Sequence, residues 1–221
     1  MSRLLVICFD GLNRKAVEKY SLKNIMQVEY GDVVTGAGMM SGALWTTLIT
    51  GEPPTKHKIH GWDSQALNDS FYLDKLGFKV LVRYARNPIV VYYPFLDERW
   101  PSMFLGIEHL PQETIIKRNT EVYEESLEKI QDPHWDLFLV CFMIIDNLYH
   151  YGKLDEGAYR TADRWVKDLK EAGNPGWTLV LGDKGTDHRP PGFYSSSKKL
   201  SLSNPNWRDF YKIIMEDILK C

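Results

Sequence analysis

Three runs of predominantly apolar residues stand out along the chain, at 4–9, 137–145 and 177–181. Runs of this length are typical of strands that are buried on both faces, as the strands of a parallel sheet are. We therefore predict buried strands at 4–9, 136–145 and 177–181. Even the longest run is well short of the ~20 apolar residues that span a bilayer, so no association with a membrane is expected.

Stretches with apolar residues at helical spacing lie between these runs and after them. They predict helices at 13–20, 44–49, 71–76, 120–130 and 158–169, and a last helix from Asn204-Pro205 to about Leu219. Asn119 is expected to cap the helix that follows it. Weaker strand patterns lie at 32–35, 79–83 and 89–93. Strands that alternate with amphipathic helices predict an α/β fold, here a three-layer α/β/α sandwich with a mostly parallel central sheet.

Length and composition favour one domain of this class. The chain has 221 residues, of which 44% are apolar, and a domain has roughly 100–200 residues. We predict a single domain over 1–221 with a small cap or insertion within 63–118, where 94–111 is irregular and rich in aromatic residues and proline. The 27 basic and 29 acidic side chains give a net charge of −2. No stable binding of nucleic acid is expected, because that needs a clearly basic face.

The cysteines and the N-terminal segment bear on the compartment. Cys8 and Cys141 lie in the apolar runs and are expected to be small buried side chains, and Cys221 is the third cysteine. Three cysteines give no disulfide framework and favour a reducing compartment. The first apolar stretch is short, ends at Asp10 and lacks the small-residue cleavage site of a signal peptide. The sequence therefore predicts a cytoplasmic protein.

Three carboxylates follow the predicted buried strands: Asp10, Asp146 and Asp183. Because the carboxyl ends of parallel strands meet at one edge of a sheet, where ligands bind, we expect these side chains to converge. His150 and His188 add nitrogen donors, and such a mixed set suits zinc, manganese or a similar divalent ion. Asp146 and His150 alone are better explained by a helix start followed by a surface histidine. The full set favours a metal site.

Other motifs carry less information. His57 and His60 are spaced like metal ligands, but lysines flank His57 and a loop role is favoured. Gly36 to Ser41 is a weak match to a dinucleotide-binding pattern, since it does not directly follow the first strand. It is a flexible backbone that can approach a phosphate and present Ser41, whose chemistry improves where a cation lowers its pKa. Neither a Gly-x-Ser-x-Gly elbow nor a GxxxxGK[ST] phosphate loop is present.

Five segments, in order along nearly the whole chain, resemble those of a known family. They are LLVICFDGL around Asp10; SGALWTTLITG from Ser41 to Gly51, followed by PPTKHKI; WDLFLV followed by Asp146-x-x-x-His150; LVLGDKG from Leu179 to Gly185; and His188-Arg-Pro-Pro-Gly-Phe193. Together they are similar to the alkaline phosphatase superfamily, and within it to the type I phosphodiesterase and nucleotide pyrophosphatase group. The specificity of the signal lies in the order of the segments.

The resemblance implies two metal ions side by side and transfer of a phosphoryl group to a serine. The implied ligands are Asp146, His150 and His188 for one ion, and Asp10, Asp183 and Ser41 for the other. Ser41 would also be the nucleophile. In two-metal sites one ion activates the attacking oxygen and the other stabilises the leaving oxygen. Water would then hydrolyse the phosphoserine.

Two features depart from the family's pattern. Lys184 stands where the family has the histidine of Asp-His-Gly, and a protonated lysine cannot replace imidazole as a ligand. Beside Asp10 and Asp183, the charged form of a lysine is favoured. Lys184 would instead supply a fixed positive charge or contact the substrate phosphate, which leaves the second metal position weak or empty. The chain is also short for the family, so the cap is reduced to roughly 63–118 and an open site favours broad specificity.

These observations predict a metal-dependent hydrolase of phosphoric esters that acts through a phosphoseryl intermediate, with phosphodiesters or nucleotide pyrophosphates preferred over monoesters. The expected cofactor is zinc, with manganese or magnesium as alternatives, at one or two ions per chain. The expected partner is a small phosphoric ester or a nucleotide. A sulfatase or phosphonate hydrolase of the same fold ranks lower, the sulfatase because Ser41-Gly-Ala-Leu-Trp45 lacks the C/S-x-P-x-R context. Lys184 motivates the alternative, a catalytically impaired member that binds a phosphorylated ligand at a single-metal site.

Overall fold

A computed structural model describes residues 3–36, 38–62, 64–67, 69, 71–104 and 110–219, so Cys221 lies outside the described residues. One sheet contains the strands β1 (Leu4–Phe9), β2 (Glu29–Val33), β3 (Pro88–Val91), β4 (Leu137–Phe142), β5 (Trp177–Gly182) and β6 (Gly192–Ser196). The helices are α1 (Arg14–Lys19), α2 (Ser41–Thr50), α3 (Pro54–His57), α4 (Ser64–Leu67), α5 (Tyr72–Lys75), the 3-10 helix η1 (Leu81–Arg83), α6 (Trp100–Phe104), α7 (Gln112–Lys129), α8 (Ile144–His150), α9 (Glu156–Gly173) and α10 (Trp207–Leu219).

The sheet is mostly parallel, in the order β2-β6-β5-β1-β4-β3. β1 lies between β4 and β5 and pairs with both in parallel, and β3 pairs with β4 in parallel. β6 is antiparallel to both of its neighbours, β5 and β2. Every residue of β1, β4 and β5 is buried, as predominantly apolar runs predict for strands covered on both faces.

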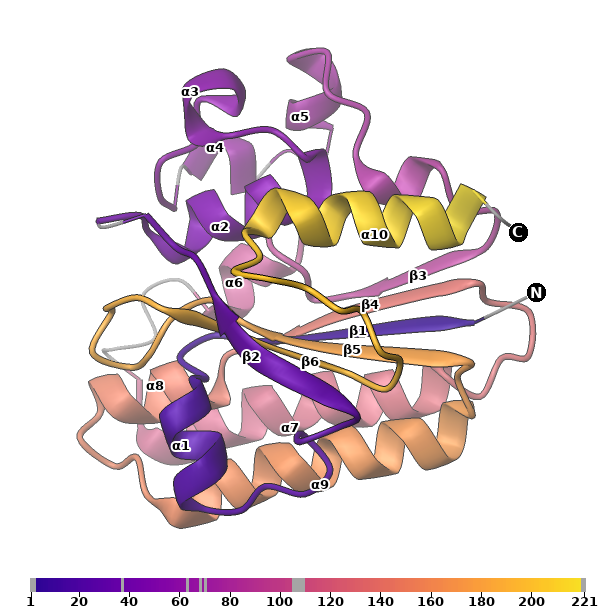
Figure 1. The fold of residues 1–221 in the computed structure, drawn as a ribbon. Coiled ribbons are helices and arrows are strands. Elements are labelled where there is room, and N and C mark those ends of the chain that lie inside the picture. The colour runs from indigo at the N-terminus through magenta and orange to yellow at the C-terminus, as the bar shows by residue number, and fades with distance from the viewer. Residues whose placement is uncertain are drawn as a thin grey trace.

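Helices cover both faces of the sheet (Figure 1), which confirms the predicted three-layer α/β/α sandwich. On one face α2 packs against α10, and Trp45 of α2 is fully buried with its ring edge-on to Trp207 at a centroid distance of 5.4 Å. On the other face lie α1, α7, α8 and α9. Within the described residues, none of the helices combines the length and the apolar character needed to cross a membrane.

α9 shows how the local sequence sets a helix and its buried face. Asp155 caps its start by accepting a hydrogen bond from the Ala158 N–H, and Asn174 ends it in a left-handed conformation with φ 41°. The buried side chains recur at helical spacing: Ala158, Tyr159, Ala162, Trp165, Val166 and Leu169. This stripe packs towards the sheet, where the Trp165 ring lies 4.9 Å from that of Phe142 in β4.

Several predicted elements are wrong in extent or type. Residues 79–83 form no strand and contain η1, and β4 ends at Phe142 so that Asp146 lies in a helix. α7 begins at Gln112 rather than at 120, and Asn119 is not its cap. The buried Asn119 amide instead donates to the carbonyl of Ile115 and to Asn147, and accepts the Met143 N–H. Asn119 therefore ties α7 to the start of α8.

The segment 63–118, predicted to hold a cap or insertion, contains α4, α5, η1, β3, α6 and the first residues of α7. Because β3 pairs with β4, residues 88–91 belong to the central sheet and not to an inserted cap. Residues 63, 68, 70 and 105–109 lie outside the described residues. That a cap shapes substrate access stays a prediction. Cys8 and Cys141 are free, buried and directly opposite each other in β1 and β4, as expected of small core side chains.

Glu29, at the start of β2, fastens the segment after β6 to the sheet. Its carboxylate accepts the backbone N–H groups of Leu200, Ser201 and Leu202 at 2.8, 2.9 and 3.3 Å and the Tyr194 hydroxyl at 3.0 Å. Partial burial raises the pKa of Glu29, but these hydrogen bonds outweigh it and hold the pKa below its ordinary value. The ionised carboxylate therefore stabilises the fold.

Replacing Glu29 with glutamine is expected to lower the free energy of unfolding by about 1–2 kcal/mol at pH 7, because a glutamine side chain makes weaker hydrogen bonds to these donors. Since the folded pKa is depressed, the stabilisation is present above the unfolded-state pKa of about 4.3 and is lost as the pH falls through the folded one. Urea unfolding at pH 7 and pH 3 should show the difference shrink. The exposed Glu124→Gln is the matched control, and an equal loss at both pH values would contradict the prediction.

Candidate functional site

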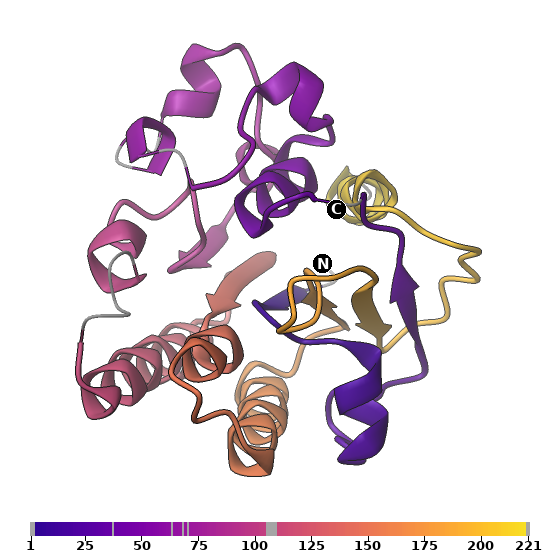
Figure 2. The same ribbon diagram turned by 90° about the vertical axis from the view of Figure 1, so that its left-hand side faces the viewer.

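The three carboxylates predicted to converge do so at the carboxyl edge of the sheet, which faces the viewer in Figure 2. Asp10 directly follows β1, Asp183 directly follows β5, and Asp146 lies in the first turn of α8, which follows β4. Their exposed fractions are 2%, 0% and 8%. The parallel pairing of β1 with both neighbours brings these residues together, although they are far apart in the sequence.

Burial perturbs all three carboxyl groups. It raises the pKa of Asp10, and the nearby charges of Asp183 and Asp146 raise it further. Burial also raises the pKa of Asp146 to about 6, although His150 opposes the shift. The pKa of Asp183 is raised by burial as well, against the hydrogen bond from the Gly11 N–H and the positive charge of Lys184. Carboxylates that are buried close together repel one another and favour a cation between them.

Asp146, His150 and His188 form a group that could hold a metal ion, with one ligand atom of each within 4.8 Å of the others. α8 places Asp146 and His150 one turn apart on the same face. The Nε2 atoms of His150 and His188 are 3.1 Å apart, and they lie 3.5 and 3.9 Å from the carboxylate oxygens of Asp146. One of these oxygens, Asp146 Oδ1, is buried and has no hydrogen-bond partner.

This donor set fits a divalent ion of the zinc type. Two imidazoles and one carboxylate leave a coordination position open, as in catalytic zinc sites. Both imidazoles are partly exposed, at 48% and 41% of their side chains, so the position faces solvent. His188 has φ 56°, a left-handed conformation that is uncommon outside glycine and that occurs at functional sites. Asp10 and Asp183 belong to no such group among the described residues, so a second ion there stays a prediction from the resemblance.

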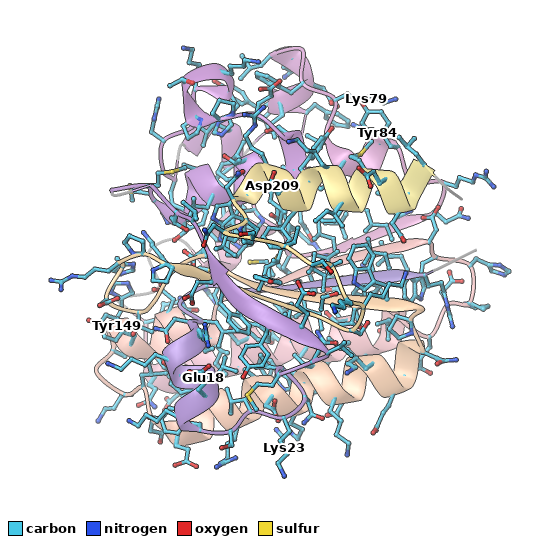
Figure 3. The ribbon with its side chains drawn as sticks, viewed as in Figure 1. Glu18, Lys23, Lys79, Tyr84, Tyr149 and Asp209 are labelled. Carbon is cyan, nitrogen blue, oxygen red and sulfur yellow. The ribbon has the colours of Figure 1, made fainter. Side chains whose placement is uncertain are left out.

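Tyr149 lies at the rim of this group and was not among the predicted site residues. Its ring lies edge-on to His150 and His188, with centroid distances of 5.7 and 6.3 Å. The side chain is 41% exposed and is labelled in Figure 3, at the end of the molecule where α8 lies. Its position beside His150 in α8 was visible in the sequence, but its contact with His188 depends on the fold.

Ser41 begins α2, next to the carboxylates. Its hydroxyl donates to Asp10 Oδ1 at 3.3 Å, and the residue is 6% exposed. Met40 precedes it without a side-chain cap, so the first N–H groups of this ten-residue helix are open to an anion. Gly42 allows the helix to pack tightly, because a Cβ there would lie 2.2 Å from the Gly61 carbonyl oxygen.

One cavity of about 420 Å³ brings these groups together, a size suited to a small molecule. Its lining residues are Asp10, Gly38, Met39, Met40, Ser41, Trp62, Asp146, His150, Lys184 and His188. Met39, Met40 and Trp62 were not predicted and form an apolar wall. The Trp62 ring is held by stacking on Trp100, at a centroid distance of 4.6 Å. Nothing in the sequence around Trp62 signals this position.

Lys184 lies in the same cavity and is buried, at 6% exposure. Its ammonium group donates to the carbonyl oxygen of Met39 at 3.1 Å. It makes no ion pair within the described part of the chain, although its charge lowers the pKa of Asp10, Asp146 and Asp183. The lysine therefore lines the cavity, and its donors are not consumed by a carboxylate. That it acts as a fixed positive charge or contacts a substrate phosphate stays a prediction.

His57 has a structural position away from this group. It ends α3 and is fully buried, where Nε2 lies 3.2 Å from the Thr47 hydroxyl and Nδ1 accepts the Ile59 N–H. Burial lowers the pKa of His57 to about 4, so the imidazole is neutral at pH 7. His57 therefore holds the turn after α2, in keeping with the predicted loop role, and His60 is exposed.

The sequence matches no protein-family model, and a search of curated proteins found no match. Solved structures share the fold. A 2-O GAG sulfatase is similar with a TM-score of 0.67 and 10% identity, over 98% of this chain and 70% of the sulfatase. Phosphonoacetate hydrolase from Sinorhizobium meliloti 1021 is similar with TM-scores of 0.56 in complex with phosphonoacetate (14% identity) and 0.51 in complex with phosphonoformate (15% identity). The match covers 83% of the present chain and 57% of the hydrolase, so the present chain spans little more than half of that protein's length. The chain therefore has the alkaline phosphatase-like fold that the resemblance predicts.

Proposed function

We propose that this protein is a metal-dependent hydrolase of phosphoric esters that prefers phosphodiesters or nucleotide pyrophosphates over monoesters. One observation carries the proposal: the Ser41 hydroxyl opens into the same cavity as the metal-ligating group of Asp146, His150 and His188. A nucleophile and an ion next to it are the parts that phosphoryl transfer needs. The fold supports the proposal, since its solved relatives include a phosphonoacetate hydrolase and a sulfatase.

In this proposal Asp146, His150 and His188 hold the divalent ion, which is zinc, manganese or magnesium. When bound, such an ion supplies positive charge that polarises a phosphoryl oxygen and stabilises the charge that develops in the transition state. The Asp146 carboxylate contributes its unpartnered oxygen to the ion. His150 and His188 contribute the two Nε2 atoms that lie 3.1 Å apart.

The chain's own residues carry the covalent steps. Ser41 Oγ attacks phosphorus, the bond from phosphorus to the leaving oxygen breaks, and a phosphoserine forms. The hydroxyl proton passes to Asp10, whose Oδ1 already accepts it at 3.3 Å. The open N–H groups at the start of α2 favour the negative charge of the phosphate. Attack of water on the phosphoserine releases the phosphate product, and Asp10 returns the proton to Ser41.

The preference for diesters rests on the wall of the cavity. Met39, Met40 and Trp62 give apolar surface beside Ser41, where the second organic group of a diester can be buried. A monoester has no such group to place there. Burial of apolar surface stabilises binding by about 25 cal/mol per Å², so a diester gains affinity at this wall.

The test is hydrolysis of bis-p-nitrophenyl phosphate and of p-nitrophenyl phosphate by metal-stripped protein that has been reloaded with zinc, manganese or magnesium. We expect turnover only after reloading, with kcat/KM about tenfold or more in favour of the diester, a difference of about 1.4 kcal/mol. Faster turnover of the monoester would contradict the stated preference. No turnover with any of the metals would contradict the hydrolase.

A second candidate function is binding of a phosphorylated ligand without turnover. The buried Lys184 ammonium in the cavity favours it, because the lysine supplies an anion-binding group that the proposed steps do not require. Tight binding of inorganic phosphate by the reloaded protein, together with no hydrolysis of either ester, would support this alternative.

A further inference from the structure

Lys184 is the single lysine or arginine that is buried among the described residues. A buried ammonium group needs partners, because its desolvation is costly. Its one hydrogen bond in the described structure is to the carbonyl oxygen of Met39, in the segment that leads into Ser41. An ammonium group has three N–H donors, so Lys184 keeps donors for whatever occupies the cavity that it lines.

The carboxylates next to Lys184 do not form a complete set of metal ligands. Asp10 and Asp183 gain no third histidine, cysteine or acidic donor within the described residues, in contrast to the group around Asp146. One oxygen of each carboxylate is already engaged, since Asp10 Oδ1 accepts the Ser41 hydroxyl and Asp183 Oδ1 accepts the Gly11 N–H at 3.0 Å. Asp183 Oδ2 is buried without a partner. The Asp10 and Asp183 carboxylates are stabilised by a nearby positive charge, and the Lys184 ammonium supplies it.

We propose that Lys184 takes the place of a second metal ion, so that the site binds one divalent ion per chain and uses the Lys184 ammonium to hold the oxygens of a phosphate group bound beside Ser41. The inference rests on the proposed function in that both use this cavity. The new inference concerns which groups bind the phosphate and how many metal ions each chain holds. The turnover assay measures neither of these two properties.

The charge balance points to the class of substrate. One divalent ion and one ammonium carry three positive charges, which balance the three carboxylates of the site when these are ionised. A second divalent ion in place of the ammonium would leave an excess of positive charge. A balanced site favours a singly charged phosphodiester over a doubly charged monoester, because it offers less attraction for the additional charge. Lys184 thus sets the charge of the ester that the site accepts.

Metal content tests the stoichiometry. The full chain is stripped, loaded with zinc, freed of unbound metal and analysed by plasma mass spectrometry. We expect one zinc ion per chain in the wild type and in Asp183→Asn, and none in His150→Ala. Two ions per chain in the wild type would overturn the proposal, even where hydrolysis is observed. One ion without hydrolysis would leave the proposal standing and count against the proposed function.

Phosphate affinity tests the role of the ammonium. Calorimetric titration of the zinc-loaded protein with inorganic phosphate is expected to show binding at least about tenfold weaker in Lys184→Ala, which loses a charged hydrogen bond. Lys184→Met keeps an apolar side chain of similar length in the cavity and should show the same loss if the alanine variant folds poorly. Lys15→Ala, at an exposed position on α1, is the matched control and should bind as the wild type does. Unchanged affinity in Lys184→Met would overturn the proposal.

Discussion

Replacing Ser41 with alanine is expected to lower kcat for bis-p-nitrophenyl phosphate by roughly a thousandfold or more, while the metal content stays at the wild-type level. Removal of an attacking side chain has effects of this size in hydrolases that use a covalent intermediate. Among the described residues that line the cavity, Ser41 alone carries a hydroxyl or thiol. No neighbouring hydroxyl or thiol in the described lining can therefore replace it as the nucleophile.

The variant should keep its fold, because the change is small. The Ser41 side chain makes one hydrogen bond, to Asp10, and its loss costs about 1 kcal/mol. Ser203→Ala, at an exposed serine in the segment before α10, is the matched control and should keep full activity. Single-turnover kinetics and zinc content would be measured for both variants. Metal-dependent activity within tenfold of the wild type in Ser41→Ala would mean that water attacks phosphorus directly.

The central strands could be predicted from the sequence because a strand that is buried on both faces is a continuous stretch of mostly apolar residues. β1 and β5 appear as apolar runs with bounds within one residue of the prediction. β6 could not be predicted in this way, since its sequence Gly-Phe-Tyr-Ser-Ser is polar in part. Its serines are buried because hydrogen bonds satisfy them, as when Ser196 accepts the indole N–H of Trp177. The pattern of apolar and polar residues does not show which buried polar side chains have hydrogen-bond partners.

The ends of elements were harder to predict, because tertiary contacts decide them. The apolar run 137–145 contains both β4 and the start of α8, and no polar residue marks the change. Asparagine is a common helix cap, but the side-chain oxygen of Asn119 instead accepts the Met143 N–H and so joins α7 to the start of α8. The side chain satisfies a buried donor far along the chain, and this requirement outweighs the local preference.

The site residues at strand ends were predicted because parallel pairing brings such positions together whatever the loops do. Asp10 and Asp183 directly follow β1 and β5, and Asp146 lies in the helix that follows β4, so the order of the strands is enough to bring the three together. Trp62 could not be predicted, since it reaches the cavity through a loop that follows α3 and is oriented by its stack on Trp100. Long-range packing of this kind leaves no regular spacing in the sequence.

Replacing Gly182 with alanine is expected to lower the free energy of unfolding by about 3 kcal/mol, at the upper end of the range for overpacked cores. Gly182 ends β5, where it pairs with Phe9 of β1 on one side and Phe193 of β6 on the other. A Cβ at this position would lie 2.1 Å from the Leu12 carbonyl oxygen and 2.9 Å from its carbon. The obstacle is backbone rather than a flexible side chain, so a change of rotamer cannot relieve it.

Gly157→Ala is the matched control, since a Cβ there would meet the side chain of Asp155 at 3.1 Å in the first turn of α9. Alanine favours a helix by about 1 kcal/mol over glycine, so the stability of this variant should stay within about 1 kcal/mol of the wild type in urea unfolding. Gly182→Ala within that same margin would contradict the prediction.

Gly182 also lies next to the candidate site, because Asp183 follows it directly and accepts a hydrogen bond from the Gly11 N–H at 3.0 Å. Relief of the overlap has to move either β5 or the connection from β1 to α1, and both carry an acid of the site. We therefore expect Gly182→Ala to lose activity at temperatures where it is still folded. A variant that is destabilised but fully active would show instead that the strain is absorbed away from Asp10 and Asp183, in the part of the connection around Leu12 that leads into α1.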